Sequence, residues 1–247
     1  MKTGIQGNSK CLKRLDSLAI SLDGDENAND INRGQGTFLK IIEAIKIARA
    51  EGLKVATNTV INLNNLKSID TVISLAKNLG FTAEFNLPYE QSLGNKNNPI
   101  MNLGDENIRM VLKKLIEYKK QGAPISFSNA VRLYVLRWPF SYDKKIIYID
   151  LPENFKIVNC YMGRFMCLIE PDGFVYPCGQ LIGKFPALNI REAGFKKAWE
   201  NLLQKRTCKA CYSLCFTEFN QFFALMPSVV FSTITLFLKG FINCGIL

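Results

Sequence analysis

The sequence contains no histidine. Catalytic sites of the Ser-His-Asp and Cys-His types use imidazole as the general base, so both types are excluded. Zinc sites with histidine ligands are excluded for the same reason. Any metal site in this chain must therefore depend on cysteine thiolates, assisted by carboxylates.

Blocks of like charge and an apolar N-terminal segment are also absent. The formal net charge is +10 over 247 residues, but the lysines and arginines are dispersed and are not interleaved with aromatic residues. This dispersion is typical of a solvated lysine-rich surface, so we expect no nucleic-acid partner. The first ten residues are polar and lack the core of a secretory signal. We therefore expect a cytoplasmic protein whose eight cysteines are reduced.

Short apolar runs alternate with stretches of helical period in the first half of the chain. The expected strands are 15–22, 54–61 and 81–87, and the expected helices are 37–50, N-capped by Thr37, 66–79 and 105–120. This alternation predicts βαβ units that form a parallel sheet.

The second half of the chain lacks this regular alternation of strands and helices. Residues 124–157 are less periodic and are expected to form a connection that contains a helix. Pro171-Asp172-Gly173 predicts the turn of a hairpin within 160–181, and a helix is expected over 190–204. Residues 219–238 carry no charge. Three interpretations stay open for them: a helix packed on this protein or another subunit, which we favour, a membrane-surface helix, or a membrane span.

Six of the cysteines fall into two spaced groups. Cys160 and Cys178 flank the expected hairpin, which also contains Cys167, and Cys208 and Cys211 have the two-residue spacing of a metal-binding knuckle. Cys215 follows four positions later. This pattern predicts a four-thiolate site, and Cys160, Cys178, Cys208 and Cys211 are the favoured ligands.

The final choice of ligands, the role of the two isolated cysteines and the identity of the metal stay open. Cys215 and Cys167 compete for a place among the four ligands, whereas Cys11 and Cys244 stand alone and are expected to be plain thiols. The spacing by itself leaves zinc and an iron–sulfur cluster open, and the additional thiols favour iron–sulfur.

Two motifs carry a resemblance to a known family. Cys160-x12-Gly173-x4-Cys178, with the segment EPDGFVYPC, resembles the opening of the SPASM or twitch domain of radical S-adenosylmethionine (SAM) enzymes. ISLDG followed by INRGQGTF, ending at Phe38, resembles the fourth strand and the following turn of the radical SAM barrel. The helix before Cys208 is similar to the same family. The resemblance covers roughly residues 15–218.

The resemblance implies an α/β fold, with the C-terminal half of a partial (β/α)6 radical SAM barrel followed by a small cysteine-rich SPASM/twitch-like domain. The implied domains are a partial barrel of three βα units (1–123), a connection (124–157), an auxiliary-cluster domain (158–218) and a hydrophobic tail (219–247). It also implies an auxiliary [4Fe-4S] cluster.

Two departures from the family pattern matter. The cysteine spacing Cys208-x2-Cys211-x3-Cys215 is shorter than the full SPASM pattern, which favours one auxiliary cluster. The CxxxCxxC motif that holds the catalytic cluster is absent. The chain is therefore expected to be the back part of an enzyme, from a truncated gene model or a degenerate protein, and inactive alone.

The resemblance also implies a SAM site at the strand ends, which would bind SAM only together with the missing N-terminal part. Ser21 and Arg33 match positions that contact SAM at the carboxylate of the SAM molecule. Asn58 matches a polar position that faces the cofactor. Asp23 lies at the same end of the first strand. Alternatively, Asp23 serves only a turn and Arg33 is a surface cation. Glu84 and Asn86 are less favoured candidates for the barrel interior.

The implied activity of the intact enzyme is the reductive cleavage of SAM to methionine and a 5′-deoxyadenosyl radical, which takes hydrogen from an unknown substrate. The expected partners are that substrate, for which a peptide is one candidate, an electron donor, and a membrane surface touched by 219–238. The competing hypothesis is a non-catalytic zinc-thiolate module on an α/β scaffold.

Overall fold

The computed structural model describes residues 15–88, 99–204 and 208–238. Its central feature is a parallel sheet with the strand order β1-β2-β3. The strands are β1 (Ser17–Ser21), β2 (Lys54–Val60) and β3 (Thr82–Asn86). Ser21 pairs in register with Asn58, and Asn58 pairs with Glu84. The expected parallel sheet is thus confirmed.

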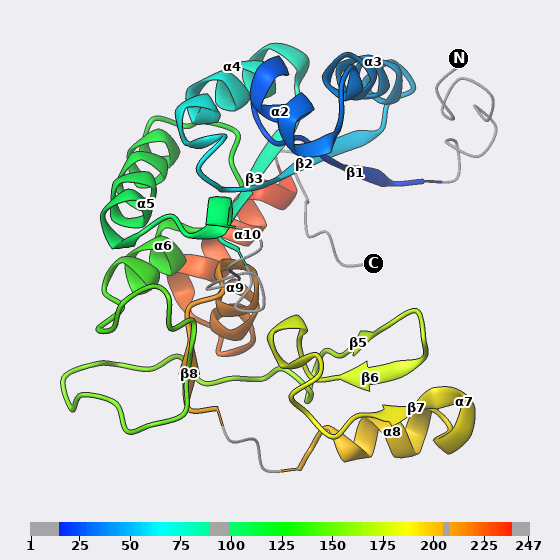
Figure 1. Cartoon of the computed structure of the whole chain (residues 1–247), viewed down its shortest axis with the longest axis vertical. Helices are drawn as coiled ribbons and strands as arrows, with labels where there is room; N and C mark the ends of the chain where they lie inside the picture. The colour runs from blue at the N-terminus through cyan, green and yellow to red at the C-terminus, as the bar shows by residue number, and fades with distance from the viewer. Residues whose placement is uncertain (1–14, 89–98, 205–207, 239–247) are drawn as a thin grey trace.

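Helices cover one face of this sheet (Figure 1). They are α2 (Glu26–Arg33), α3 (Thr37–Ala50), α4 (Ile69–Leu79), which follows the short helix η1 (Leu66–Ser68), and α5 (Asp105–Lys120), which follows η3 (Pro99–Met101). The predictions for α3 and α5 are confirmed. The predicted cap is wrong: the N-cap of α3 is Gly36, and Thr37 is the first helical residue, whose hydroxyl donates to the carbonyl of Gly34 at 2.7 Å. Helix α2 was not predicted.

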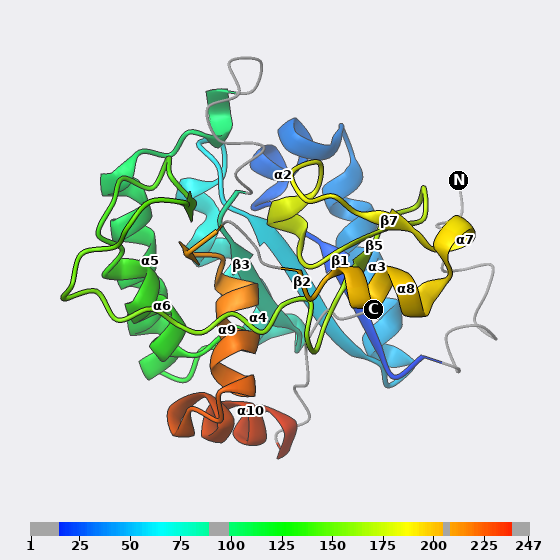
Figure 2. The same cartoon turned by 90° about the horizontal axis from the view of Figure 1, so that it is seen from below.

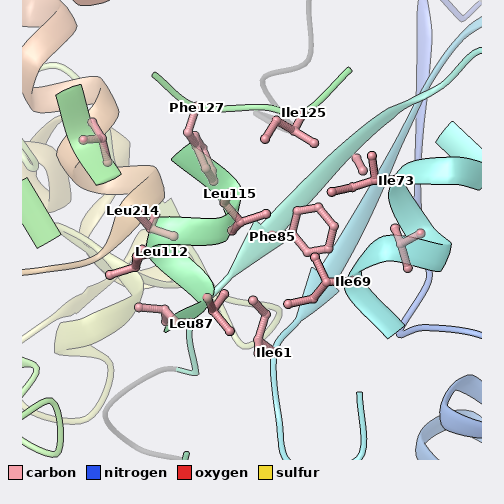
Figure 3. Close-up of a cluster of buried hydrophobic side chains, with 14 of the residues drawn as sticks. Ile61, Ile69, Ile73, Phe85, Leu87, Leu112, Leu115, Ile125, Phe127 and Leu214 are labelled. Carbon is pink, nitrogen blue, oxygen red and sulfur yellow. The ribbon is translucent and has the colours of Figure 1, made fainter. Parts of the chain in front are cut away.

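The main core lies between the sheet and these helices. Figure 3 shows Phe85 of β3 between Ile69 and Ile73 of α4 and Leu115 of α5. Phe85 is 1% exposed, and the other three side chains are equally buried. Alternate residues of β3 therefore point into the helix layer, which leaves Glu84 and Asn86 on the opposite face.

Residues 158–201 lie on the opposite side of the parallel sheet from α2 to α5, whereas the helix over 129–136 packs beside α5 (Figures 1 and 2). An antiparallel sheet has the order β5-β6-β7, and a separate two-stranded ladder joins β4 to β8. The elements are α6 (Asn129–Leu136), β4 (Ile146–Ile147), β5 (Leu168–Ile169), β6 (Phe174–Tyr176), η4 (Gly179–Leu181), β7 (Leu188–Asn189), α7 (Ile190–Ala193), α8 (Phe195–Asn201), β8 (Ala210–Cys211), α9 (Leu214–Phe223) and α10 (Pro227–Leu238). The hairpin expected within 160–181 is confirmed.

Two helix predictions need correction. The helix expected over 190–204 is broken at Gly194, whose φ of 75° suits glycine and separates α7 from α8. The apolar stretch 219–238 is divided between α9 and α10, which meet at a bend of 106°. Among the described residues, no single helix is long and apolar enough to cross a membrane, and only the bent pair passes by length and composition.

Candidate functional site

A cavity of about 550 Å³ opens at the carboxyl ends of the parallel strands. Asp23 and Arg33 line it from the β1 side, Asn58 lines it from β2, and Asn86 lines it from β3. Parallel α/β folds bind ligands at this end of their strands. The structure thus brings three of the four predicted cofactor-binding residues together. Ser21 lies beside Asn58 in register but is outside the cavity lining.

Asp23 and Arg33 form an ion pair across the loop that follows β1. Nε of Arg33 lies 2.8 Å from Oδ2 of Asp23, whose side chain is 9% exposed. The backbone N–H of Asp23 donates to Oδ1 of Asn29 at 3.0 Å, which fixes the loop against α2. Arg33 is therefore not a free surface cation. Oδ1 of Asp23 is buried without a hydrogen-bond partner.

Helix α2 places Arg33 because two acidic residues order its ends. Asp25 caps the helix by accepting from the N–H of Ala28 at 2.9 Å. Asp30 accepts from the N–H groups of Phe38, at 2.8 Å, and Gly36, at 2.5 Å, beyond the other end of the helix. The hydrogen bond from Phe38 is the largest influence on Asp30 and, with the others, lowers the pKa of its carboxyl. The turn in INRGQGTF is thus built around Asp30.

Asparagine side chains supply much of the remaining cavity wall, and the sequence reasoning missed several of them. Asn32, Asn62 and Asn64 line the cavity together with the apolar residues Ile100 and Met101. Nδ2 of Asn64 donates to Oδ1 of Asn32 at 2.9 Å, whereas Nδ2 of Asn32 is buried without a partner. The concentration of asparagine directly after β2 was the available signal.

Glu84 lies on the open face of the sheet beside Asn58. Nδ2 of Asn86 donates to Oε1 of Glu84 at 2.7 Å and to Oδ1 of Asn58 at 3.1 Å. Burial raises the pKa of the Glu84 carboxyl, and the hydrogen bond from Asn86 opposes this effect. The less favoured sequence candidates thus join Asn58 in one hydrogen-bonded group.

Four thiols of the second half of the chain influence one another electrostatically. Burial is the main cause that raises the pKa of Cys178 and of Cys211 to about 12. The neighbouring thiols of Cys160 and Cys208 raise both values further, and Cys211 also acts on Cys178. Electrostatic influence of this kind requires proximity. The four favoured thiols of the sequence analysis thus lie within electrostatic range of one another, and their role as metal ligands stays a prediction.

A short ladder and a tight turn hold these thiols. Cys211 pairs with Ile146 in the β4–β8 ladder, which the sequence reasoning did not foresee. In the hairpin before Cys178, Gly173 has a φ of 94° and donates its N–H to the carbonyl of Glu170 at 2.8 Å. A Cβ on Gly173 would lie 2.8 Å from Oδ1 of Asn189. The glycine of the Cys-x12-Gly-x4-Cys motif is thus required by both conformation and space.

The other described cysteines, Cys167 and Cys215, are not among the causes of these pKa shifts. Burial alone raises the pKa of Cys167. Cys215 is the second residue of α9 and, like Cys178, packs on Met162, Phe216 and Phe219. Cys11 and Cys244 lie outside the described residues. Within the described ranges, no three Cys, Asp or Glu side chains are close enough to hold one metal ion.

Comparisons with known proteins extend these observations. No protein-family model matches the chain. The chain is 28% identical over 196 residues to the AdoMet-dependent heme synthase of Methanosarcina barkeri (strain Fusaro / DSM 804), and the alignment covers 74% of this chain and 53% of that protein. The chain therefore spans about half the length of this curated relative.

Two solved structures share the fold. Native anSMEcpe with bound AdoMet and Kp18Cys peptide has a TM-score of 0.53 and 17% identity, covering 92% of this chain and 72% of its own. SuiB of Streptococcus suis has a TM-score of 0.50 and 14% identity, covering 77% of this chain and 45% of its own. The expected resemblance is confirmed: the chain has a partial radical SAM fold and is similar in sequence to an AdoMet-dependent enzyme.

Proposed function

We propose that this chain supplies part of the SAM site and one auxiliary [4Fe-4S] site of a radical SAM enzyme. The observation that carries this proposal is the mutual electrostatic influence of four thiols, from Cys160, Cys178, Cys208 and Cys211, in a chain whose strand-end cavity is lined by the Asp23–Arg33 ion pair. SAM would be cleaved by one-electron reduction into methionine and a 5′-deoxyadenosyl radical, which removes a hydrogen atom from the substrate.

The ion pair suits the amino-acid end of SAM. That end carries an ammonium and a carboxylate, whereas the cavity offers a carboxylate and a guanidinium. Among the described residues, the only hydrogen bond or ion pair of Arg33 is the one its Nε makes with Asp23, so its terminal nitrogens can bind a carboxylate in a planar fork. The carboxylate of Asp23 supplies the negative charge opposite the ammonium. The pair would thus orient the ligand by its zwitterionic end.

The donor set fits an iron–sulfur cluster. Four thiolates are its usual protein ligands. Thiolates around a single zinc ion lie about 3.8 Å apart, given tetrahedral bonds of about 2.3 Å. The additional clustered thiols of Cys167 and Cys215 favour an iron–sulfur cluster over the zinc module. When bound, the cluster would bind substrate or relay an electron.

We also propose a peptide as the substrate class. The support is the likeness to anSMEcpe, whose structure contains a bound peptide together with AdoMet. The polar group of Asn58, Glu84 and Asn86 on the open face of the sheet would offer hydrogen bonds to such a ligand.

The test of the cluster is anaerobic reconstitution of the full chain with ferrous iron and sulfide. We expect a brown protein with about four iron and four sulfide ions per chain and visible absorbance that bleaches on reduction. Cys178→Ala should lose most of the iron, whereas the matched variant Cys167→Ala should retain it, because only Cys178 is influenced by the other thiols. Full iron content in Cys178→Ala would refute the ligand set, and a colourless protein with one zinc ion would favour the zinc module.

A further inference from the structure

A groove of about 880 Å³ lies between α6 and the segment 154–158. Three of the apolar side chains that line it are exposed, with exposed fractions of 38% for Leu133, 47% for Ile157 and 40% for Met226. Two exposed cations, Arg137 at the end of α6 and Lys156, line it as well. Among the described residues that line the groove, none carries a carboxylate. The groove is thus an apolar surface whose charged groups are all positive.

One side chain separates this groove from the cysteine group. Tyr134 lines the groove, and its hydroxyl donates to the carbonyl of Cys211 at 3.3 Å. Burial is the main cause that raises the pKa of Tyr134, and the thiols of Cys211 and Cys160 raise it further. Val158, which also lines the groove, is two positions before Cys160. A molecule in the groove would therefore lie one tyrosine side chain away from the proposed cluster, which is the short path that electron transfer requires.

The groove lies far from the edge at which further barrel strands would join the sheet. The sheet has the order β1-β2-β3, and the strands that are expected to precede this chain would extend it from β1. Helix α6 packs beside α5, beyond β3, at the opposite end of the sheet from β1 (Figures 1 and 2). An intact barrel would therefore grow away from the groove and leave it open.

The chemistry of the groove favours a negatively charged protein as its occupant. Arginine and apolar side chains are typical of protein interfaces, and positive charge around an apolar patch accelerates association with an acidic partner. The formal net charge of +10 on the whole chain acts in the same direction. Complexes that transfer electrons are transient and bury less than about 1,200 Å² in total, so a groove with two cations is sufficient.

We propose that this groove docks the electron donor of the enzyme, a small acidic protein that carries one electron on an iron–sulfur centre. The electron would enter at the cluster of the four thiols, so this inference rests on the proposed auxiliary cluster. The carrier is oxidised by one electron and the cluster is reduced by the same electron. No bond forms or breaks, and no proton is transferred.

The experiment measures electron transfer between an acidic plant-type ferredoxin and the anaerobically reconstituted full chain by stopped-flow mixing. A redox titration first identifies the partner of lower potential, and that partner receives the electron beforehand, so that transfer runs downhill. Arg137→Glu combined with Lys156→Glu should lower the second-order rate constant at low salt about tenfold or more, because electrostatic steering contributes at least this factor. Added salt should slow the wild-type reaction and should not slow that of the double variant.

A matched control makes the same change of net charge elsewhere. Lys40→Glu combined with Lys67→Glu alters exposed positions of α3 and η1 and should lose much less of the rate constant. Iron content should equal that of wild type in both double variants, because the four substituted side chains are exposed.

The outcomes separate this inference from the proposed function. If reversal in the groove slows transfer no more than the control, or if salt leaves the wild-type rate constant unchanged, the docking site is refuted and the cluster stands. A wild-type chain that takes up no cluster would overturn the proposed function and this inference with it. If the groove variant fails to fold, Lys156→Glu alone decides: it should slow transfer about threefold, half of the tenfold effect on a logarithmic scale, and an unchanged rate constant would refute the proposal.

Discussion

Glu218 connects α9 to the start of α6, and its removal tests how strongly the contact between these two helices stabilises the protein. Both carboxylate oxygens accept from the N–H of Ser128 at 3.0 Å, and Oε2 also accepts from its hydroxyl at 2.8 Å. Arg132, one turn further along α6, is 1% exposed and donates to the carbonyls of Phe127, at 2.8 Å, and Ser126. Burial lowers the pKa of Arg132 to about 10, and Glu218 opposes this effect.

Glu218→Ala should therefore lower the free energy of unfolding by about 1.5–3 kcal/mol, the usual worth of hydrogen bonds to a charged group, because those from Ser128 are lost. Glu218→Gln should lose about half as much, since its amide oxygen still accepts from Ser128 while the charge opposite Arg132 is gone.

Urea denaturation followed by circular dichroism measures this change. Glu200→Ala, at an exposed position with no side-chain partner among the described residues, is the control and should stay within about 0.5 kcal/mol of wild type. Arg132→Met added to Glu218→Ala should recover part of the loss, because the uncompensated cation is removed. A loss below about 1 kcal/mol in Glu218→Ala, or no recovery in the double variant, would refute this account of the α6–α9 contact.

Two further predictions concern local structure. Gly173→Ala should lower the free energy of unfolding by about 1–3 kcal/mol, because alanine at a φ of 94° is strained and its Cβ would displace Asn189. Urea denaturation measures this loss, and an unchanged free energy of unfolding would contradict the assigned turn. Asp30 has a pKa lowered below 3.8 chiefly by the N–H of Phe38, so its contribution to stability is complete above pH 3.8 and is lost as the pH falls through the folded pKa. The stability difference between wild type and Asp30→Asn should thus be constant above pH 3.8 and shrink below it, and a difference that grows on acidification would contradict this sign.

The regular elements of the first half could be predicted because their buried residues recur at short, regular intervals along the sequence. Helix α5 buries Ile108, Val111, Leu112 and Leu115 at helical spacing, and its predicted bounds match the structure. Helix α2 lacks this signal, since its sequence ENANDINR contains one large apolar residue. Its formation depends on the cap at Asp25 and on Asp30, which binds backbone beyond the helix end. Such a helix is fixed by polar contacts that periodicity does not report.

The elements of the second half were harder to predict from the sequence because they depend on partners that are distant along the chain. The β4–β8 ladder joins residues more than sixty positions apart through two residues on each side, so neither strand has a local pattern. The bend between α9 and α10 follows Leu225, whose φ of 54° is unusual for a non-glycine residue. For the candidate site, the spacing of the cysteines was sufficient to select the four thiols that influence one another, whereas the ion pair of Asp23 with Arg33 emerged only from the fold.

Lys145 explains how the two parts of the proposed site keep a fixed relation. Its ammonium is buried at the end of β3, where it donates to the carbonyls of Leu87 at 3.2 Å and Pro88 at 2.5 Å, both residues of the cavity lining. Its own carbonyl accepts from the N–H of Tyr212 at 3.3 Å, directly after Cys211. One residue thus contacts the cavity wall through its side chain and the cysteine group through its backbone.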